Sequence, residues 1–326
     1  MATPVDQLCK RRKITPLDLL TPILIPSFSS KGFPEFDWLW KNSKNYLNDV
    51  ALVSSYDIYY DLIDAEIEAT NIVMVDSGGY EARKDYDLSE IYGGEYEPRE
   101  WDREKHRFAI GKIKTLSPLI LISYDELNNH DISTQVKEAN SFFAEFDEAT
   151  TDFLIKPTQA SFIDIDNLEA NLHLLANFDI LGVTEKELGN SLVERLQNVV
   201  RLRKGLSHLG LEIPIHIFGC LDPICVWLFY LCGADLFDGL SWLRFAFYEN
   251  VPVYRNSWAV LNGQAAIPDD ELILITLMQN LDILNKQRLL MARFTEHYDF
   301  AALPIKLEAI QNVLGQAEVS LVERSA

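Results

Sequence analysis

Three aspartates stand where short apolar runs of this sequence end. Asp76, Asp125 and Asp238 each follow a run that is typical of a buried strand. The carboxyl ends of parallel strands are the place where α/β folds carry their chemistry. Two carboxyl groups in different environments can divide the work between a nucleophile and a general acid or base. The sequence therefore predicts a barrel enzyme in which Asp238 is a nucleophile or an acid/base group.

Other residues after the same runs would suit the binding of a flat heterocycle. Another of the three carboxylates could accept hydrogen bonds from ring N–H groups, and glycines would let backbone amides approach a ligand. Tyr80 and Phe218 could stack on the two faces of a base. Each residue alone has an ordinary structural explanation, such as a helix cap or a turn, and it is their joint occurrence that favours a site. The remaining candidates are Ser77, Gly78, Gly79, Lys156, Gln159, Gly182 and Gly219.

Eight apolar runs alternate with stretches of helical periodicity, and they would position these residues. The alternation indicates a parallel sheet that is covered on both faces. Eight such units favour an α/β fold of the (β/α)8 TIM-barrel class, and periodicity leaves an open doubly wound sheet as the alternative. The expected strands are 23–26, 50–53, 71–75, 119–122, 153–155, 178–181, 215–218 and 234–237.

The barrel with its site is expected over residues 1–250, and a helical extension over 251–326. Helices are expected over 36–47, 102–116, 133–150 and 192–206, with another opened by Asp222-Pro223. In the extension we expect a loop over 258–268, a helix capped by Asp269-Asp270-Glu271 that reaches Asn285 or beyond, and a second helix over 303–313. The polar segment 86–103 is expected to be a long loop over the barrel mouth.

The chain is acidic, with 49 Asp and Glu against 29 Lys and Arg and a formal net charge of −20. This excess argues against a broad nucleic-acid-binding face, although it permits a local basic groove. The densest positive clusters are 10–13 and 201–204, and a solvated surface is the simpler explanation for each. The hydrophobic share of 48% suits a globular protein with a large core.

The cysteines and the first residues bear on location. Cys9, Cys220, Cys225 and Cys232 have no paired spacing, so we expect buried thiols in a reducing cytoplasm. Residues 1–13 do not have the pattern of a signal peptide, and the apolar run 226–232 is too short to span a bilayer. We therefore expect a cytoplasmic protein without membrane association.

The order of the motifs resembles the tRNA-guanine transglycosylase superfamily, including the related enzymes that insert 7-deazaguanines into DNA. DSGGY at 76–80 is the most specific match. The resemblance extends over about 21–244, and Arg244 falls where the family has the arginine of its PTR element. The other matching segments are TPILIP at 21–26, YDE at 124–126, IFG at 217–219 and GADLFD at 233–238.

The resemblance implies a (β/α)8 barrel that exchanges a base by double displacement. Asp238 would match the nucleophile that attacks the sugar C1′ and expels guanine, and an incoming 7-deazaguanine would resolve the covalent intermediate. Asp76 would match the general acid/base, and Asp125 the carboxylate that reads the pyrimidine edge. Tyr80 and Phe218 would match the stacking pair. Gly182 would match a backbone contact to the 7-substituent, and either its segment or 156–159 would occupy the base-binding position.

The sequence also departs from the family pattern. No cysteine follows Cys232, so the family's zinc motif is absent and no metal or other cofactor is expected. Glu81 and Leu127 stand where the family has Gln and often Cys. These departures favour DNA over tRNA as the substrate. The expected partners are nucleic acid and a 7-deazaguanine-type base, while a partner protein subunit and a homodimer both stay open.

Two other functions stay open. In a base-excising glycosylase or nucleoside hydrolase, water would resolve the adduct on Asp238 and no base would be inserted. In a non-catalytic barrel subunit of a nucleic-acid modification complex, the carboxylates would have lost their role. The missing zinc ligands and the net charge of −20 motivate the second alternative, while the presence of Asp76 and Asp238 speaks against it.

Overall fold

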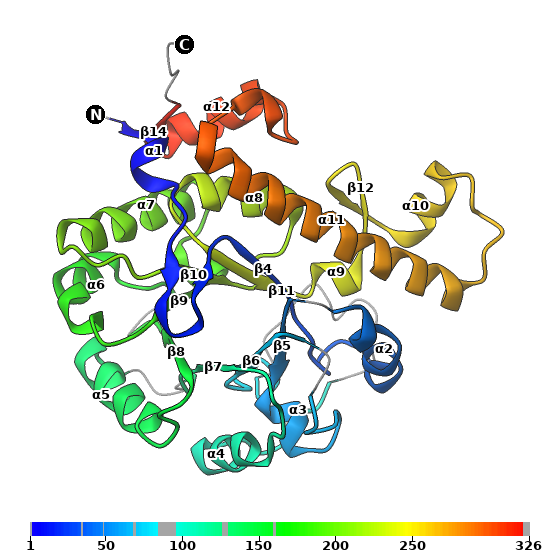
Figure 1. The fold of residues 1–326 in the computed structure, drawn as a ribbon, viewed down its shortest axis with the longest axis horizontal. Helices are drawn as coiled ribbons and strands as arrows, with labels where there is room; N and C mark the ends of the chain where they lie inside the picture. Colours follow the sequence, from blue (N-terminus) through cyan, green and yellow to red (C-terminus); the bar gives the residue numbers. More distant parts are fainter. Residues whose placement is uncertain are drawn as a thin grey trace.

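The computed structural model describes residues 2–33, 35–47, 49–67, 70–83, 96–125, 130–158 and 161–321. Eight parallel strands form one sheet in the order β4-β11-β10-β9-β8-β7-β6-β5, and helices surround it (Figure 1). At the seam between β4 and β5, the N–H of Phe28 donates to the carbonyl of Leu52 (2.9 Å), so the sheet is a nearly closed barrel. This confirms the TIM-barrel class over an open sheet. The strands are β4 (Ile23–Pro26), β5 (Val50–Ser54), β6 (Ile72–Asp76), β7 (Leu119–Ile122), β8 (Thr150–Ile155), β9 (Ile180–Thr184), β10 (Ile215–Phe218) and β11 (Leu236–Gly239).

Alternate residues of each strand face the inside of the barrel and the surrounding helices. Ile23 and Ile25 of β4 belong to the inner apolar cluster, whereas Leu24 between them packs with the outer one. This is the two-residue period of a strand that is buried on both faces. A short hairpin of β2 (Lys13–Ile14) and β3 (Leu19–Leu20) covers one end of the barrel, because Ile14 packs on the inner cluster. The polar side chains described below occupy the other end.

The helices begin at residues that can cap them. Asp222 accepts hydrogen bonds from the N–H groups of Ile224 and Cys225, as expected from the sequence. Asp102, Asp131 and Ser191 cap the expected helices 102–116, 133–150 and 192–206 in the same way. The helices of the barrel are α2 (Phe36–Ser43), α3 (Ser55–Tyr59), α4 (Arg103–Lys112), α5 (Ile132–Phe143), α6 (Ile165–Asn171), α7 (Leu192–His208) and α8 (Pro223–Leu231).

Two strands begin later than expected. The runs 178–181 and 234–237 contain Asp179 and Asp235, which stand before β9 and β11. Their carboxylates accept backbone N–H groups of the neighbouring strands, from Thr151 (2.9 Å) and Ile215 (2.9 Å). Because β9 continues to Thr184, Gly182 lies inside this strand and not at its end, which corrects that prediction.

The extension follows β11 and projects from the barrel (right side of Figure 1). The expected loop 258–268 is wrong in part, because Trp258 and Ala259 form part of a helix that packs on Leu272. The long helix is confirmed and continues well beyond Asn285, but Asp269, Asp270 and Glu271 lie in its first turn and do not cap it, since the N-cap residue is Pro268. The last helix begins at Leu307 and not at 303. The elements are α9 (Ser241–Arg244), β12 (Ala246–Tyr248), β13 (Val251–Val253), α10 (Arg255–Leu261), α11 (Asp269–His297) and α12 (Leu307–Gln316).

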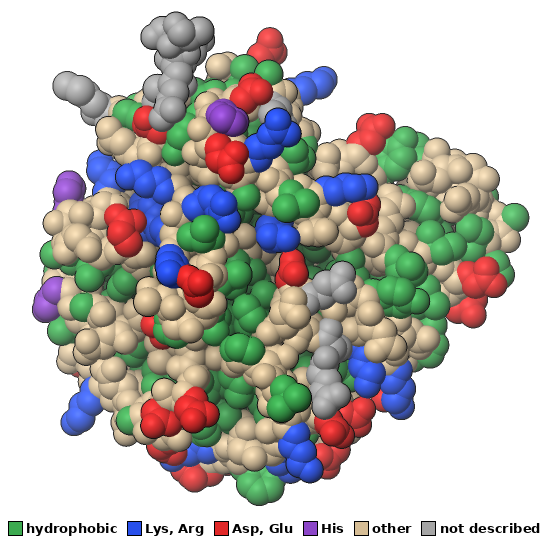
Figure 2. Space-filling view, viewed as in Figure 1, with side chains coloured by type: hydrophobic (Ala, Val, Ile, Leu, Met, Phe, Trp, Pro, Cys, Tyr) green, Lys and Arg blue, Asp and Glu red, His purple; other side chains and the backbone are tan. Residues whose placement is uncertain are grey.

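The sequence suggested that the positive clusters 10–13 and 201–204 are solvated surface, and this is wrong for one arginine in each cluster. Arg12 and Arg203 are buried, and both pair with the buried carboxylate of Asp235, at 3.0 and 2.5 Å. Thr21 also donates to Asp235 (3.3 Å). This cluster joins the amino-terminal segment, α7 and the start of β11. On the face shown in Figure 2, the exposed basic side chains are interspersed with acidic ones.

Strands near the two ends of the chain pair with each other, and the cysteines form no disulfides. β1 (Thr3–Pro4) pairs in parallel with β14 (Val319–Ser320). All four cysteines are free thiols, and all but Cys225 are buried, as expected. The described helices include none whose length and hydropathy would let it traverse a bilayer.

Candidate active site

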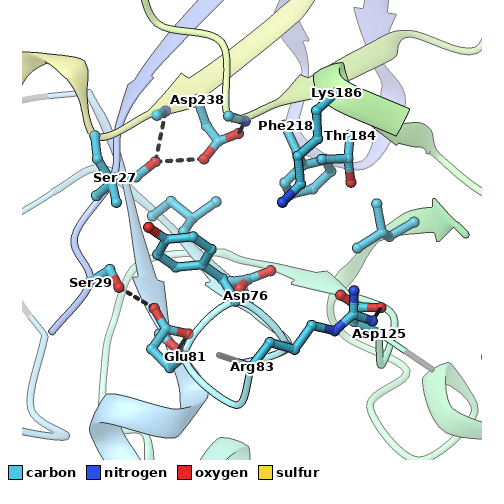
Figure 3. Close-up of a pocket in the computed structure, with 18 of the residues that line it drawn as sticks. Ser27, Ser29, Asp76, Glu81, Arg83, Asp125, Thr184, Lys186, Phe218 and Asp238 are labelled. Atoms are coloured by element: carbon cyan, nitrogen blue, oxygen red, sulfur yellow. Dashed lines mark hydrogen bonds and ion pairs between the residues drawn. The ribbon is translucent and has the colours of Figure 1, made fainter. Parts of the chain in front are cut away.

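A cavity of about 190 Å³ opens at the carboxyl ends of the barrel strands (Figure 3). The predicted site residues that line it are Asp76, Gly79, Tyr80, Asp125, Lys156, Phe218, Gly219, Asp238 and Arg244. Ser77, Gly78 and Gly182 are not among the described lining residues. Gln159 lies outside the described residues, as do Glu126, Leu127 and residues 86–95 of the expected lid segment.

Asp238 is held by hydrogen-bond donors from both neighbouring strands. Ser27, just after β4, donates through its hydroxyl to Oδ2 (2.7 Å), and the Gly219 N–H after β10 donates to Oδ1 (3.0 Å). Gly219 adopts φ +79°, a conformation that favours glycine, and this directs its N–H to the carboxylate. The N–H of Gly239 donates to the Ser27 hydroxyl oxygen (3.1 Å). The hydroxyl proton of Ser27 is therefore free to be donated to Asp238. Asp238 is thus an oriented carboxylate, only 6% exposed.

A buried histidine lies below Asp238 inside the barrel. Nε2 of His216 is 3.5 Å from Oδ1 of Asp238, and its Nδ1 is 2.7 Å from Oδ2 of Asp152. Neither His216 nor Asp152 was singled out from the sequence. The available signal was their position on the inner face of β10 and β8, each two residues before an inner apolar residue, Phe218 and Leu154.

Asp76 can hold a proton near neutral pH. Burial raises the pKa of Asp76, and the charges of Glu81, Asp238 and Asp125 raise it further, to about 8. Glu81, which stands where the family has Gln, accepts hydrogen bonds from the hydroxyls of Ser29 and Ser54. The site therefore contains one carboxyl group suited to donate a proton beside the oriented carboxylate of Asp238.

Asp125 is paired with two cations. Arg83 donates to Oδ1 (3.0 Å), and Nζ of Lys156 lies 3.4 Å from Oδ2 and 2.7 Å from Glu187. A Cβ at Gly79 would be 2.5 Å from Oδ2 of Asp125, so glycine is needed for this approach. The DSGGY motif thus places Asp76 and makes room for Asp125.

The two aromatic candidates both line the cavity. The Arg244 guanidinium donates to the Tyr80 hydroxyl (3.0 Å), and the Lys31 ammonium lies 4.4 Å from the centre of the Tyr80 ring. Phe218 rests on His216, with ring centres 3.9 Å apart. The cavity therefore combines apolar rings with paired charges, which suits a planar and polar ligand.

The described part of the expected lid segment packs beside the DSGGY turn. The indole of Trp101 donates to the carbonyl of Ser77 (2.9 Å), and a Cβ at Gly78 would be 2.9 Å from the Trp101 ring. The hydroxyl of Tyr96 donates to the carbonyl of Glu81 (2.9 Å). Ser77 and Gly78 thus support the turn, whose following residues reach the cavity.

Comparisons with known proteins give no further assignment. No protein-family model matches the sequence, and no curated protein matches it. Within the described part of the chain, no group of three or more His, Cys, Asp or Glu side chains is placed to hold a metal ion. The resemblance to the transglycosylase superfamily therefore rests on the motifs and stays an interpretation.

Proposed function

We propose that this chain is a pentosyltransferase that replaces guanine in nucleic acid, DNA in preference to tRNA, with a 7-deazaguanine. The observation that carries the proposal is the pairing of two unlike carboxyl groups in one cavity. Asp238 is oriented by Ser27 and Gly219, and the pKa of Asp76 is raised to about 8 by burial and by neighbouring carboxylates. An oriented carboxylate beside a protonated one is the arrangement that covalent glycosyl transfer needs.

In the first step, a carboxylate oxygen of Asp238 forms a bond to the sugar C1′ as the C1′–N9 bond breaks. The electron pair of that bond leaves with guanine, which takes the proton of Asp76. In the second step, the incoming base forms a new bond to C1′ and gives its ring proton to Asp76, while the Asp238–sugar bond breaks. Two inversions at C1′ retain its configuration.

The rest of the cavity supplies the binding of the base. Asp125 accepts hydrogen bonds from the base in exchange for one of its cationic partners, Arg83 or Lys156. Tyr80 and Phe218 supply the stacking surfaces. Because the cavity lies at the barrel mouth, the base must be flipped out of its helix to reach it. The net charge of −20 makes a basic partner subunit the expected source of further phosphate contacts, and we place the protein in the cytoplasm.

The test is to trap and map the covalent intermediate. Incorporation is measured by incubating the protein with labelled guanine and either DNA or tRNA. The covalent adduct of protein and nucleic acid is isolated under denaturing conditions, and its position is located by peptide mapping. We expect an adduct on Asp238 and incorporation into DNA. We expect Asp238→Asn to lower incorporation at least about 1,000-fold, because Asn is not a nucleophile here.

A matched control is Asp164→Asn at the start of α6, where Asn also caps a helix well and normal activity is expected. Incorporation into tRNA alone would overturn the preference for DNA. Release of a free base with an abasic site, and without incorporation, would identify an excising glycosylase. Full activity of Asp238→Asn would overturn the covalent mechanism.

A further inference from the structure

A charged pair inside the barrel reaches the proposed nucleophile from below. Asp152 of β8 and His216 of β10 are both fully buried, and their side chains are 2.7 Å apart. The other nitrogen of His216 lies 3.5 Å from Asp238, which belongs to the next strand, β11. The three side chains thus form a chain of alternating charge across the barrel interior.

Strand β9 lies between Asp152 and His216 and has a glycine where a side chain would block their contact. β9 separates β8 from β10, and Gly182 lies opposite His216 on one side and Leu154 on the other. A Cβ at Gly182 would be 2.8 Å from Oδ1 of Asp152 and 2.6 Å from the Phe218 ring. A side chain on β9 would therefore push Asp152 away from His216.

The electrostatics of the pair favour an imidazolium. Burial lowers the pKa of His216, but the charge and hydrogen bond of Asp152 and the interaction with Asp238 outweigh it and raise the pKa to about 9. Asp152 from β8 and Asp238 from β11 are the charged groups that face His216, and β9 contributes only Gly182. The His216 imidazolium therefore lies beside the carboxylate of Asp238, in an interior that otherwise disfavours charge.

We propose that Asp152 and His216 are positioning residues that keep Asp238 ionised and aligned for its reaction with the sugar. This inference rests on the proposed function and deepens it. The imidazolium stabilises Asp238 as a carboxylate, so the group is available for attack and is a good leaving group when the sugar is passed to the incoming base. Asp152 acts through His216 by holding both of its nitrogens protonated.

The first experiment needs no substrate. Side-chain NMR of the full-length protein, labelled at histidine nitrogens, follows the protonation of His216 between pH 6 and pH 10, with the signal assigned by its loss in His216→Gln. We expect His216 to carry two protons at pH 7 and to lose one near pH 9, and Asp152→Asn to leave it neutral at pH 7. A neutral His216 at pH 7 in the unsubstituted protein would overturn the proposal.

The second experiment measures the pH dependence of adduct formation. In Asp152→Asn and His216→Gln we expect the acid limb of the profile to move up by about one pH unit or more, because the cation 3.5 Å from Asp238 is lost. We also expect the rate at pH 7 to fall about 10- to 100-fold, and the double variant to be no slower than either single one. His106→Phe is the matched control, since His106 is a buried histidine stacked on Phe142 outside the cavity.

Asp152→Asn and His216→Gln are measured separately, so if one of them does not fold, the other still tests the proposal. An unshifted acid limb in a folded variant, with adduct formation intact in the unsubstituted protein, overturns the positioning role alone. The absence of any adduct in the unsubstituted protein overturns the proposed function and this role together.

Discussion

Five carboxyl groups line one cavity in the described part of the chain, so their protonation is the main question at the scale of single residues. They are Asp76, Glu81, Asp125, Glu187 and Asp238. Asp125 and Glu187 are paired with cations, Glu81 accepts two hydroxyl hydrogen bonds, and Asp238 has its donors and the His216 ring. Asp76 is left as the group that most easily keeps a proton, which agrees with its proposed role as acid.

Replacing Asp76 should therefore change stability in a pH-dependent way. The pKa of Asp76 is about 8 in the fold against an ordinary 3.8, so unfolding releases its proton between these values. Its contribution to the free energy of unfolding is full below pH 3.8 and falls as pH rises towards 8. Asp76→Asn does not titrate, so we expect its melting temperature relative to the unsubstituted protein to rise by a few degrees, about 2–6 °C, between pH 4 and pH 8.

Thermal unfolding of both proteins at several pH values between 4 and 8 checks this. Gly111→Ala in α4 is the control and should keep a constant difference from the unsubstituted protein, because neither side chain titrates and a Cβ there would have no atom within 4 Å. A difference for Asp76→Asn that does not change with pH would contradict the raised pKa.

The carboxylates of the site could be predicted from the sequence, and their partners could not. Asp76 and Asp238 stand at the ends of recognisable strands within motifs, so position along the chain is enough to find them. Ser27 and His216 are single polar residues within or beside apolar runs. Their contacts with Asp238 depend on the pairing of β11 with β4 and β10, which local sequence does not encode.

At the scale of elements, the extension holds the segment that carries Arg244. Asn280 of α11 is buried, and its amide donates to the carbonyls of Trp242 and Phe245 at 2.7 Å each. Its side-chain oxygen accepts the N–H of Phe247 (2.7 Å). The long helix thus supports the wall of the cavity next to β11.

Strand β9 has no room for a side chain at Gly182. Gly182→Ala places a methyl group against Asp152 and Phe218, so we expect a loss of about 1–3 kcal/mol in the free energy of unfolding. We also expect it to lower adduct formation, since it disturbs the contact between Asp152 and His216. Urea unfolding and the adduct assay measure the two effects.

Gly111→Ala in α4 is the matched control, because its Cβ would have no atom within 4 Å. It should be neutral or stabilise by up to about 1 kcal/mol, as expected for Gly to Ala within a helix. Equal stability changes for the two variants would show that β9 has room for a side chain and that the pair does not depend on Gly182.

Strand positions followed from the sequence where apolar runs contain no structural charge. The runs 23–26 and 119–122 match β4 and β7 residue for residue. The ends of β9 and β11 were displaced because Asp179 and Asp235 form long-range hydrogen bonds that a local pattern does not reveal. For the same reason α10 was missed, since packing of Trp258 on Leu272 decides its conformation.

At the scale of the whole molecule, Asp235 joins distant parts of the chain. It pairs with Arg12 and Arg203 and accepts the N–H of Ile215 at the start of β10. Replacing it by Asn removes the only ion-pair partner that the buried Arg203 has among the described residues, and leaves Arg12 with the exposed Glu212 alone (3.2 Å). We expect a loss of about 3–5 kcal/mol in the free energy of unfolding, measured by urea titration.

Asp37→Asn is the control for that variant. Asp37 forms an exposed ion pair with Lys41 one helical turn away, and such pairs contribute less than about 1 kcal/mol. A loss below about 1 kcal/mol for Asp235→Asn would mean that the amino-terminal segment is attached by packing alone.

The hydrogen bonds to Asp238 also determine when during synthesis the protein can acquire its chemistry. Ser27 follows the first barrel strand and Gly239 ends the last, and these strands pair Ile23 with Leu236, 236 − 23 = 213 residues apart. A nascent chain on the ribosome would contain Asp238, but the donors that orient this proposed nucleophile would not surround it until β11 inserts between β4 and β10. Incomplete translation products would therefore be unable to carry out the proposed reaction, which needs the closed barrel.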